Sequence, residues 1–525
     1  MNTSRLARLT LDDVWIFAAV AFVILRVLLT PVPPNDFWWH MATGRELITT
    51  GRLPVVDSFS FTRAGEPFYN QSWLAQLVML GLYQAGGIPL LIVVQAAVIG
   101  LAYGLLLRLC IARSGATRLS AGVLMLLTMP ASFDNWIIRP QSYALLLFMV
   151  FLYVLSRWRE PGFAAQSTGF RKALWLLPPL AAIWVNLHGS FVLGGALIGL
   201  TFVGEGLRRF VTDRREERAW ATRPVSGPEA TMLSHPAQPK RPPLTDLIFC
   251  GLAVGAAWLL NPGGLAVLGY VRNLLSSSAV TQLVTEWAPP TIRNPGGIIF
   301  FLFVIIAIVA LAYARKQPNL VDILIAGAFL WLALGAVRNN IWFSAVATPL
   351  IVLQFAAWRE AAPTASRSPG LPSANAALIG VIGLMVVLAL PWLKPVLGLP
   401  PELGALETPQ TPVAAVAFIQ TEAEADRPQR LFSEMGFSSY LIWALPTQKV
   451  FVDPRIELYP LEQWQDYIRL GGGREPETLL TKYAIDGALL DPQSQERLID
   501  YLRVASDWQL RYEDDHAVYF VKGDG

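Results

Sequence analysis

The sequence predicts an α-helical protein that crosses a membrane about eleven times and ends in a small α/β domain. Its 525 residues are 54% hydrophobic and only 15% charged, a balance typical of polytopic membrane proteins. Apolar runs alternate with polar loops, and the pattern turns globular only after residue 412. The net charge of +3 comes from basic residues scattered over short loops, so it does not indicate nucleic-acid binding.

The predicted spans are apolar runs flanked by polar residues. A straight helix needs about 20 residues to cross the bilayer, so the third, fourth and fifth runs are short. The first run lacks a small-residue cleavage site and is interpreted as a retained helix rather than a signal peptide. Cys110 and Cys250 indicate neither a disulfide framework nor a metal cluster. The eleven runs lie near 14–30, 88–107, 119–132, 142–156, 173–187, 191–207, 246–260, 297–314, 319–336, 341–357 and 376–393.

The distribution of basic residues predicts the orientation. With a cytoplasmic N-terminus, the inner loops hold 21 Lys and Arg residues and the outer loops up to Arg338 hold seven. This excess on one side is the positive-inside pattern. The odd number of spans then places the C-terminal domain outside the cytoplasm. The expected location is a plasma (inner) membrane.

Two polar segments divide the chain. A basic inner loop at 208–245 is expected to be a solvated cytoplasmic linker, with contact to lipid headgroups as an alternative. A Pro- and Gly-rich linker at 395–412 separates a transmembrane domain, 1–394, from an extracytoplasmic α/β domain, 413–525. In that domain we expect buried strands at 449–454 and 483–491, a helix at 494–506 and a hairpin at 508–522.

The first outer loop, 31–87, holds the predicted chemical centre. Prolines end the first span, and Asn35 and Asp36 follow directly at the membrane surface. Two tryptophans and His40 come next, the composition that settles at headgroup level. The apolar segment 74–86 is too short to cross and ends in two glycines, so we expect it to be an interfacial helix leading into the second span.

The other predicted outer loops also carry polar residues just beyond helix ends. Helix capping explains many of the asparagines. It explains less well why ionisable groups recur at one membrane depth on one side, since such residues are costly there and mark function. The candidate site residues are Asp36, His40, Asp57, Asn70, Arg139, His188, Glu286, Trp287 and Arg338.

The first outer loop also carries a recognisable order of motifs. Asp36 follows the first span, a helix ends in TGR–x5–GRLP, and a polar stretch leads to a second interfacial helix ending in two glycines. This order resembles the first outer loop of the GT-C glycosyltransferases, closest to the branch with the protein O-mannosyltransferases and the lipid A aminoarabinose transferase. It is also similar to bacterial integral membrane proteins assigned only as glycosyltransferase-like. The likeness covers about 70 residues, and Asn70–Trp73 departs from the Pro-Pro of that branch.

The resemblance implies an inverting hexosyl- or pentosyltransferase. Such an enzyme moves a sugar from a polyprenyl-phosphate donor to a lipid, glycan or protein acceptor on the outer face. Asp36 would be the base, because a carboxyl with an ordinary pKa near 3.9 is ionised at neutral pH. A phosphate leaving group needs fixed positive charge or donors rather than a strong acid. Arg139, Arg338 and His188 are the candidates, and Arg26 is another unless it only snorkels to headgroups.

The remaining candidates each have two interpretations. His40 lies one helical turn after Asp36 and could orient it, bind a metal or simply pack at the interface. Asp57 and Glu286 are the carboxylates that could hold a divalent metal, which is possible but not required, and no other cofactor is expected. Glu286 and Trp287 could bind sugar or acceptor, or only pack within their loop.

Two other functions stay open at the sequence level. A transporter or flippase of lipid-linked sugars would also have many spans, but would place broken helices and ionisable groups at the bilayer midplane. A non-catalytic anchoring or assembly protein would use its C-terminal domain, where 452–460 and 483–491 would be functional surfaces rather than strand ends and turns.

Overall fold

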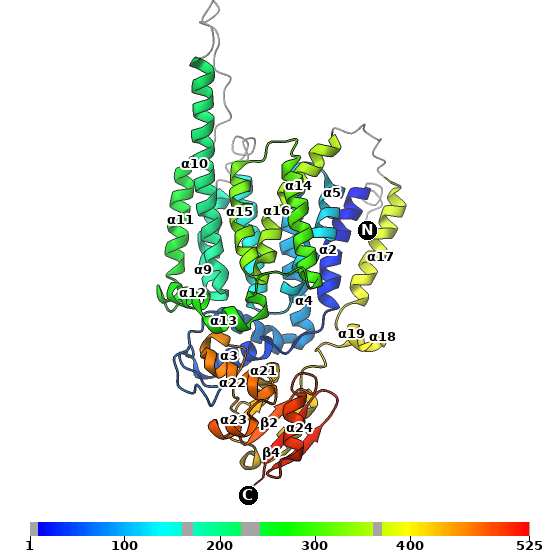
Figure 1. Cartoon of the computed structure of the whole chain (residues 1–525). Helices are drawn as coiled ribbons and strands as arrows, with labels where there is room; N and C mark the ends of the chain where they lie inside the picture. Colours follow the sequence, from blue (N-terminus) through cyan, green and yellow to red (C-terminus); the bar gives the residue numbers. More distant parts are fainter. Residues whose placement is uncertain (1–8, 160–171, 222–241, 361–369, 524–525) are drawn as a thin grey trace, which may run out of the picture.

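A bundle of apolar helices makes up the larger part of the molecule, and the chain's only sheet within the described residues lies beyond one end of the bundle (Figure 1). The computed structural model describes residues 9–159, 172–221, 242–360 and 370–523. Every one of the eleven predicted runs coincides with a helix there. The bundle helices are α2 (Leu11–Leu28), α4 (Trp73–Ser114), α5 (Thr117–Val123), α6 (Pro140–Trp158), α9 (Leu177–Leu187), α10 (Val192–Ala221), α11 (Leu244–Trp258), α14 (Pro295–Ala312), α15 (Leu320–Gly335), α16 (Asn340–Glu360) and α17 (Pro372–Leu388).

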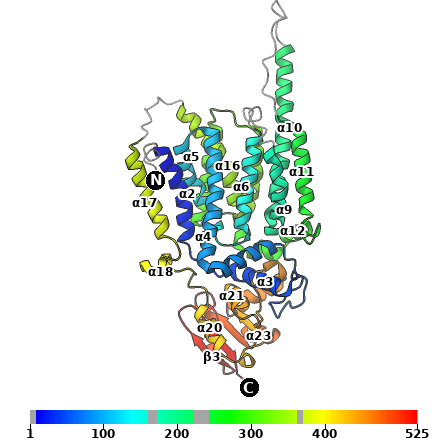
Figure 2. The same ribbon diagram turned by 180° about the vertical axis from the view of Figure 1, so that it is seen from behind.

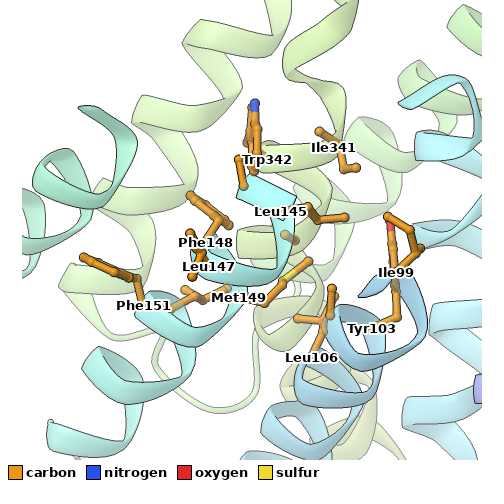
Figure 3. Packing of buried hydrophobic residues seen from close by; sticks show 14 of the residues in the cluster. Ile99, Tyr103, Leu106, Leu145, Leu147, Phe148, Met149, Phe151, Ile341 and Trp342 are labelled. Atoms are coloured by element: carbon orange, nitrogen blue, oxygen red, sulfur yellow. The ribbon is translucent and has the colours of Figure 1, made fainter. Parts of the chain in front are cut away.

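Among the described residues, five helices are long and apolar enough to cross a membrane: α4, α6, α10, α14 and α16. Two of these, α6 and α16, are mostly buried inside the bundle, whereas α14 and α10 are more exposed. Figure 3 shows part of this packing: Leu145 of α6 lies between Tyr103 of α4 and Trp342 of α16, and Phe148 of α6 lies next to Trp342. The Phe148 and Trp342 rings are 4.9 Å apart. Central helices are therefore enclosed by outer ones that present apolar surface.

The inner loop predicted to begin at residue 208 begins later. Helix α10 continues to Ala221, so residues 208–221 are helical rather than linker. This stretch is rich in Arg and Glu, which favour helix strongly. The rest of the predicted loop up to residue 241 lies outside the described residues.

The first outer loop forms the two expected interfacial elements. Helix α3 (Phe37–Thr50) follows Asp36 and ends at Gly51, whose positive φ of 64° suits glycine. The second expected element is the first part of α4. Gly86 and Gly87 leave helical geometry, and the resulting kink separates this part from the apolar run that follows. At Gly87 the φ of 63° and ψ of −162° lie in a region that only glycine adopts readily.

The C-terminal sheet has four strands in the order β1-β2-β4-β3. Strand β1 pairs parallel with β2, and the hairpin of β3 and β4 adds to β2 antiparallel. The strand predicted at 483–491, the helix at 494–506 and the hairpin at 508–522 all form. The elements are α18 (Lys394–Leu397), α19 (Pro401–Gly404), α20 (Val413–Thr421), β1 (Leu431–Ser433), α21 (Met435–Ala444), α22 (Leu461–Gly471), α23 (Pro476–Lys482), β2 (Gly487–Leu490), α24 (Glu496–Val504), β3 (Trp508–Glu513) and β4 (Val518–Lys522).

The strand predicted at 449–454 was wrong beyond one residue. Val450 alone bridges β1 on one side and Ser60 of the first outer loop on the other. After it, the Asp453 carboxylate accepts from the Arg455 backbone N–H at 2.9 Å, and Pro454 between them has no N–H to pair, so the chain turns. The first loop thereby extends the C-terminal sheet. Seen from behind, α3 and α21 lie between the bundle and the sheet (Figure 2).

Candidate active site

Asp36 stands at the start of α3, where the bundle meets the C-terminal part. Its carboxylate is about one-third exposed and does not cap the helix that it precedes. Helix α3 is held from behind by α21, because the Trp39 backbone N–H donates to Ser439 at 3.0 Å and the Trp38 ring packs on Tyr440. Burial raises the pKa of Asp36, the Arg139 charge opposes this, and Glu286 adds to it. The result is a positioned carboxylate with a pKa above its ordinary value.

Arg139 faces Asp36 from the start of α6. Its Nη1 lies 4.0 Å from Asp36 Oδ2 and donates to the two Glu286 carboxylate oxygens at 2.8 and 2.9 Å. The side chain is 7% exposed, yet Nε and Nη2 have no hydrogen-bond partner among the described residues. Buried donors without partners are costly. Because guanidinium forks match the oxygens of phosphate, an anion of that kind would satisfy these atoms.

Arg338 supplies a second cation beside the first. It lies in the short helix η7 (Val337–Asn339), with its Cζ 4.6 Å from the Trp287 ring and its Nη2 3.4 Å from Gln141. Trp287 and Glu286 share the short helix η6 (Thr285–Trp287), which is tied to η7 by a backbone hydrogen bond. One loop therefore contacts both arginines, with the carboxylate on Arg139 and the indole on Arg338.

Two neutral histidines line the same region. The Nδ1 of His188 accepts from the Ser190 backbone N–H at 3.1 Å, so its Nε2 carries the proton. Burial, then the charges of Arg338 and Arg139, hold the pKa of His188 well below its usual range. Burial and Arg139 lower the pKa of His40 to about 3. Both imidazoles are thus uncharged donors at neutral pH.

Asn70 contacts this group indirectly. It donates to Gln76 at 2.8 Å, and the Gln76 amide nitrogen lies 3.2 Å from His40 Nδ1. Since an amide nitrogen only donates, His40 Nδ1 accepts and its proton sits on Nε2. Asn70 therefore sets the tautomer of His40.

A small, mainly apolar cleft lies between the end of α2 with the prolines that follow and the segment leading to Arg139. The lining residues are Val27, Thr30, Pro31, Val32, Pro33, Ile92, Trp136, Ile137 and Ile138. The cleft has room for about one water molecule, and Ile138 directly precedes Arg139 in the chain.

The fold was compared with known proteins. No family model and no curated protein matches the sequence. Among solved structures, the archaeal oligosaccharyltransferase AglB from Archaeoglobus fulgidus, in complex with an inhibitory peptide and a dolichol-phosphate, superposes with a TM-score of 0.55 at 13% identity, covering 92% of this chain and 69% of AglB. ArnT from Cupriavidus metallidurans, bound to undecaprenyl phosphate, gives a TM-score of 0.52 at 14% identity, covering 96% of this chain and 97% of ArnT. The chain has the GT-C fold.

Within this GT-C fold, seven of the nine candidates lie together, because each either contacts another directly or shifts another's pKa through its charge. Asn70 is connected to them through Gln76. The seven are Asp36, His40, Arg139, His188, Glu286, Trp287 and Arg338. They come from separate loops at one end of the bundle. The large distance in sequence between these residues explains why their individual contacts were not predicted.

Asp57 is placed elsewhere. Its side chain is 0% exposed and pairs with Arg455 of the C-terminal part at 2.5 Å, while Ser60 donates to its other oxygen. Although burial raises the pKa of Asp57, Arg455 and Ser60 outweigh it and lower the pKa overall. Asp57 has no exposed surface for a substrate or a metal. Instead of the expected binding role, its pair with Arg455 joins the first outer loop to the C-terminal part.

A metal would need several ligands in one place. In the ranges that the structure describes, no three His, Cys, Asp or Glu side chains converge in this way. Glu286, one of the two expected metal carboxylates, is engaged by Arg139, and Asp57 is buried. The local positive charge at Asp36 comes from arginine.

Sequence reasoning missed several residues around the group. Gln76 and Gln141 orient His40 and Arg338, but isolated glutamines in helices carry no distinctive signal. Tyr270 and Glu457 also reach this end of the bundle, from the loop after α11 and from the C-terminal part. Glu457 lies within the segment 452–460 that we had singled out for another function. Only the fold brings it near.

Proposed function

We propose that the chain is a membrane glycosyltransferase that moves a sugar from a polyprenyl-phosphate donor to an acceptor on the outer face, with inversion. The observation that carries the proposal is the buried Arg139, whose Nη1 lies 4.0 Å from Asp36 Oδ2 and whose Nε and Nη2 have no hydrogen-bond partner among the described residues. AglB and ArnT, which share the fold, were solved with dolichol-phosphate and undecaprenyl phosphate. Here the donor phosphate would accept hydrogen bonds from the unpartnered nitrogens of Arg139.

The reaction assigns one role to each group. The acceptor oxygen or nitrogen attacks the anomeric carbon from the side opposite the phosphate, and Asp36 takes its proton. The bond between that carbon and the phosphate oxygen breaks, and the polyprenyl phosphate leaves with the electron pair. Arg139 and Arg338 stabilise the charge that develops on the phosphate, and the neutral His188 adds an N–H donor. Arginine charge at this position supports a reaction without a required metal, although a divalent ion stays compatible with the chemistry.

In this proposal the lipid part of the donor enters at the small apolar cleft, which must widen to admit it. Its lining runs from Val27 on α2 to Ile138, the residue before Arg139. A polyprenyl chain lying there would place its phosphate at Arg139 without unpaired polar groups against the tail. The proposal covers hexosyl and pentosyl donors and lipid, glycan or protein acceptors.

The proposed placement in the membrane is eleven crossings, with the N-terminus cytoplasmic and residues 413–525 outside as an α/β domain. The candidate site and the C-terminal part lie at one end of the bundle (Figure 1), opposite the loops that hold most Lys and Arg. Cys110 and Cys250 are buried, so an introduced cysteine can be read on its own. A membrane-impermeant maleimide should label Gln493→Cys on intact cells but Arg315→Cys only after permeabilisation, and the reverse would invert the topology.

The transfer reaction tests the function. Purified protein in detergent should consume a radiolabelled polyprenyl-phosphate sugar in the presence of envelope lipid and glycan acceptors. Asp36→Asn should lower the rate by at least about 100-fold, because a positioned base contributes about 10²–10⁴-fold. Folding should be unaffected, since the substitution keeps the side-chain shape.

A matched control is Asp134→Asn, which changes an exposed carboxylate outside the proposed site. It should leave the rate unchanged. Undiminished transfer by Asp36→Asn would refute the assigned mechanism. A wild-type protein that moves the intact donor across vesicles would indicate a flippase, and one that neither binds nor consumes the donor would indicate an anchoring protein.

A further inference from the structure

Three distant parts of the chain meet beside Arg338. Tyr69 comes from the first outer loop, Tyr270 from α12 (Ala266–Ser276), and Glu457 from the short helix η9 (Ile456–Leu458) of the C-terminal part. The two tyrosine rings stack with centroids 5.1 Å apart and planes at 22°. The Tyr270 hydroxyl donates to Glu457 Oε1 at 3.3 Å, and the Tyr69 hydroxyl donates to Asn261 at 2.7 Å.

Glu457 keeps unused capacity to accept hydrogen bonds. A carboxylate has about four acceptor positions. Among the described residues, Tyr270 is its one side-chain donor, at the long distance of 3.3 Å. Glu457 is half-buried, and this partial burial raises the pKa of its carboxyl. A ligand with hydroxyl or ammonium groups would satisfy it.

The backbone leading to Glu457 is fixed. Two residues earlier, Arg455 donates to Asp453 at 2.6 Å and to Asp57 of the first outer loop at 2.5 Å. One residue earlier, the Ile456 carbonyl accepts from the Trp464 indole at 3.1 Å. Binding would therefore not have to order this part of the chain.

The junction borders the proposed phosphate site. The positive charge of Arg338 acts on the Tyr270 hydroxyl, and Arg338 itself packs on Trp287 beside Arg139's partner Glu286. A sugar attached to a phosphate at Arg139 and Arg338 would reach this junction on the side of Tyr270. Aromatic faces beside a carboxylate suit a sugar, because the rings cover C–H surface while the carboxylate accepts O–H or N–H groups.

We propose that Tyr69, Tyr270 and Glu457 form a subsite for the hydroxyl- or amino-bearing sugar of the lipid-phosphate donor, with Glu457 as its specificity-determining acceptor. This inference rests on the proposed glycosyl transfer and adds to it where the sugar binds. It also makes the C-terminal part a contributor to the site. Asp57, buried at the joint, then acts as a positioning residue through Arg455.

The first test is Glu457→Gln, which keeps shape but removes the charge. We expect the KM for the labelled donor to rise about tenfold or more, as for the loss of a hydrogen bond to a charged group. The inhibition constant of polyprenyl phosphate without sugar should stay unchanged, because that lipid does not reach the subsite. Arg139→Gln should weaken that same inhibitor.

The second test moves Tyr69 by a substitution at a neighbouring glycine. A Cβ at Gly263 would clash with the Tyr69 hydroxyl and lie 2.8 Å from Tyr69 Cε2, so Gly263→Ala must displace the ring and should also raise the donor KM. Gly269→Ala, six residues later in α12, meets nothing within 4 Å and should leave the KM unchanged. The pair separates displacement of Tyr69 from a general effect of adding a methyl group to this part of the chain.

The outcomes separate the two proposals. Unchanged donor kinetics in Glu457→Gln, weaker binding of the bare lipid phosphate, or a change confined to the acceptor KM would each overturn the sugar subsite. An active wild type with these results would leave the proposed function standing. A wild type without transfer, or one insensitive to Asp36→Asn, would overturn the proposed function itself.

Discussion

At the scale of single residues, the account depends on how Asp36 and Arg139 differ in their surroundings. Asp36 keeps a third of its carboxylate exposed, whereas Arg139 is buried with spare donors and already holds Glu286. A base needs access to the acceptor and a phosphate site needs unpaired donors, so exposure and burial suit their proposed roles.

The pH profile of transfer tests the state of Asp36. Because burial and Glu286 raise its pKa and only ionised Asp36 can take a proton, kcat/KM should fall as pH decreases through a value above 3.8. Removing the opposing charge in Arg139→Gln should move this acid limb to higher pH, and Glu286→Gln should move it to lower pH. The measurement is the initial rate between pH 4 and 8.

His40 does not account for such a limb, since its pKa is about 3. Shifts of the limb in the same direction in the two variants, or an acid limb below 3.8, would contradict the assignment of Asp36 as the ionising base.

The sequence predicted the identities of most site residues better than their contacts. Asp36, Arg139 and Glu286 stand out because ionisable residues are rare just beyond apolar helices. The contact of Arg139 with Glu286 spans 147 positions, and no periodicity encodes such a pairing. Asp57 had the same signal as Asp36 but lies in a buried pair, because its partner Arg455 comes from a part of the chain almost 400 residues away.

At the scale of elements, the first outer loop and the C-terminal part form one joined structure. Phe59 and Phe61 exchange backbone hydrogen bonds with Val450, and α3 packs on α21. Arg455 closes the joint, with its guanidinium between the Phe59 and Phe68 rings and bonded to two carboxylates. This joint holds α3, and hence Asp36, against the rest of the site.

The joint predicts an order of destabilisation. Arg455→Met leaves Asp57 and Asp453 buried without a cation and should cost about 3–5 kcal/mol of unfolding free energy. Asp57→Asn should cost less, because Arg455 still pairs with Asp453. Thermal unfolding in detergent measures the order.

Arg469→Met is the matched control in the same part of the chain. Arg469 is 40% exposed, and its partner Asp466 also accepts from Lys482 and Tyr483, so Arg469→Met should destabilise the fold far less than Arg455→Met. If Arg469→Met destabilised as much as Arg455→Met, or if Asp57→Asn cost more than either, the joint would not have the proposed role.

Helices and strands with a strong hydrophobic pattern could be predicted from the sequence, whereas those that depend on partners far away in the chain could not. All eleven apolar runs are helices, and the hairpin at 508–522 forms because its strands are adjacent in sequence. The expected strand at 449–454 contributes only Val450, since its other neighbour is the first outer loop. Helix α10 outlasts its apolar run because charged helix formers continue it.

At the scale of the whole molecule, charged residues gather at both ends of the bundle but in different ways. At the end away from the C-terminal part, buried Asp322 pairs with Arg113 and with Arg159, which joins α15 to the ends of α4 and α6. At the other end, Arg139 keeps unpartnered donors, and its Nη1 lies 4.0 Å from the carboxylate of Asp36, which is one-third exposed. The first arrangement is suited to hold helices together, and the second to receive an anionic ligand.

The GT-C fold could be expected from one loop of about 70 residues, but neither the substrate nor the assembly of the site could. Motif order in the first outer loop reflects local chain geometry, which sequence preserves. The sugar subsite that we propose draws one residue from each of three regions, and its members have no common motif. Function at this scale depends on the fold that brings them together.

The most direct test of the central claim is a structure of the protein in a lipid nanodisc with a bound polyprenyl phosphate. We predict the phosphate within about 3 Å of Arg139 Nε or Nη2, the tail in the cleft lined by Val27 and Ile138, and the Asp36 carboxylate level with the bilayer surface. A phosphate bound at the opposite end near Arg159, or an Asp36 side chain closed off from the bound lipid, would contradict the account.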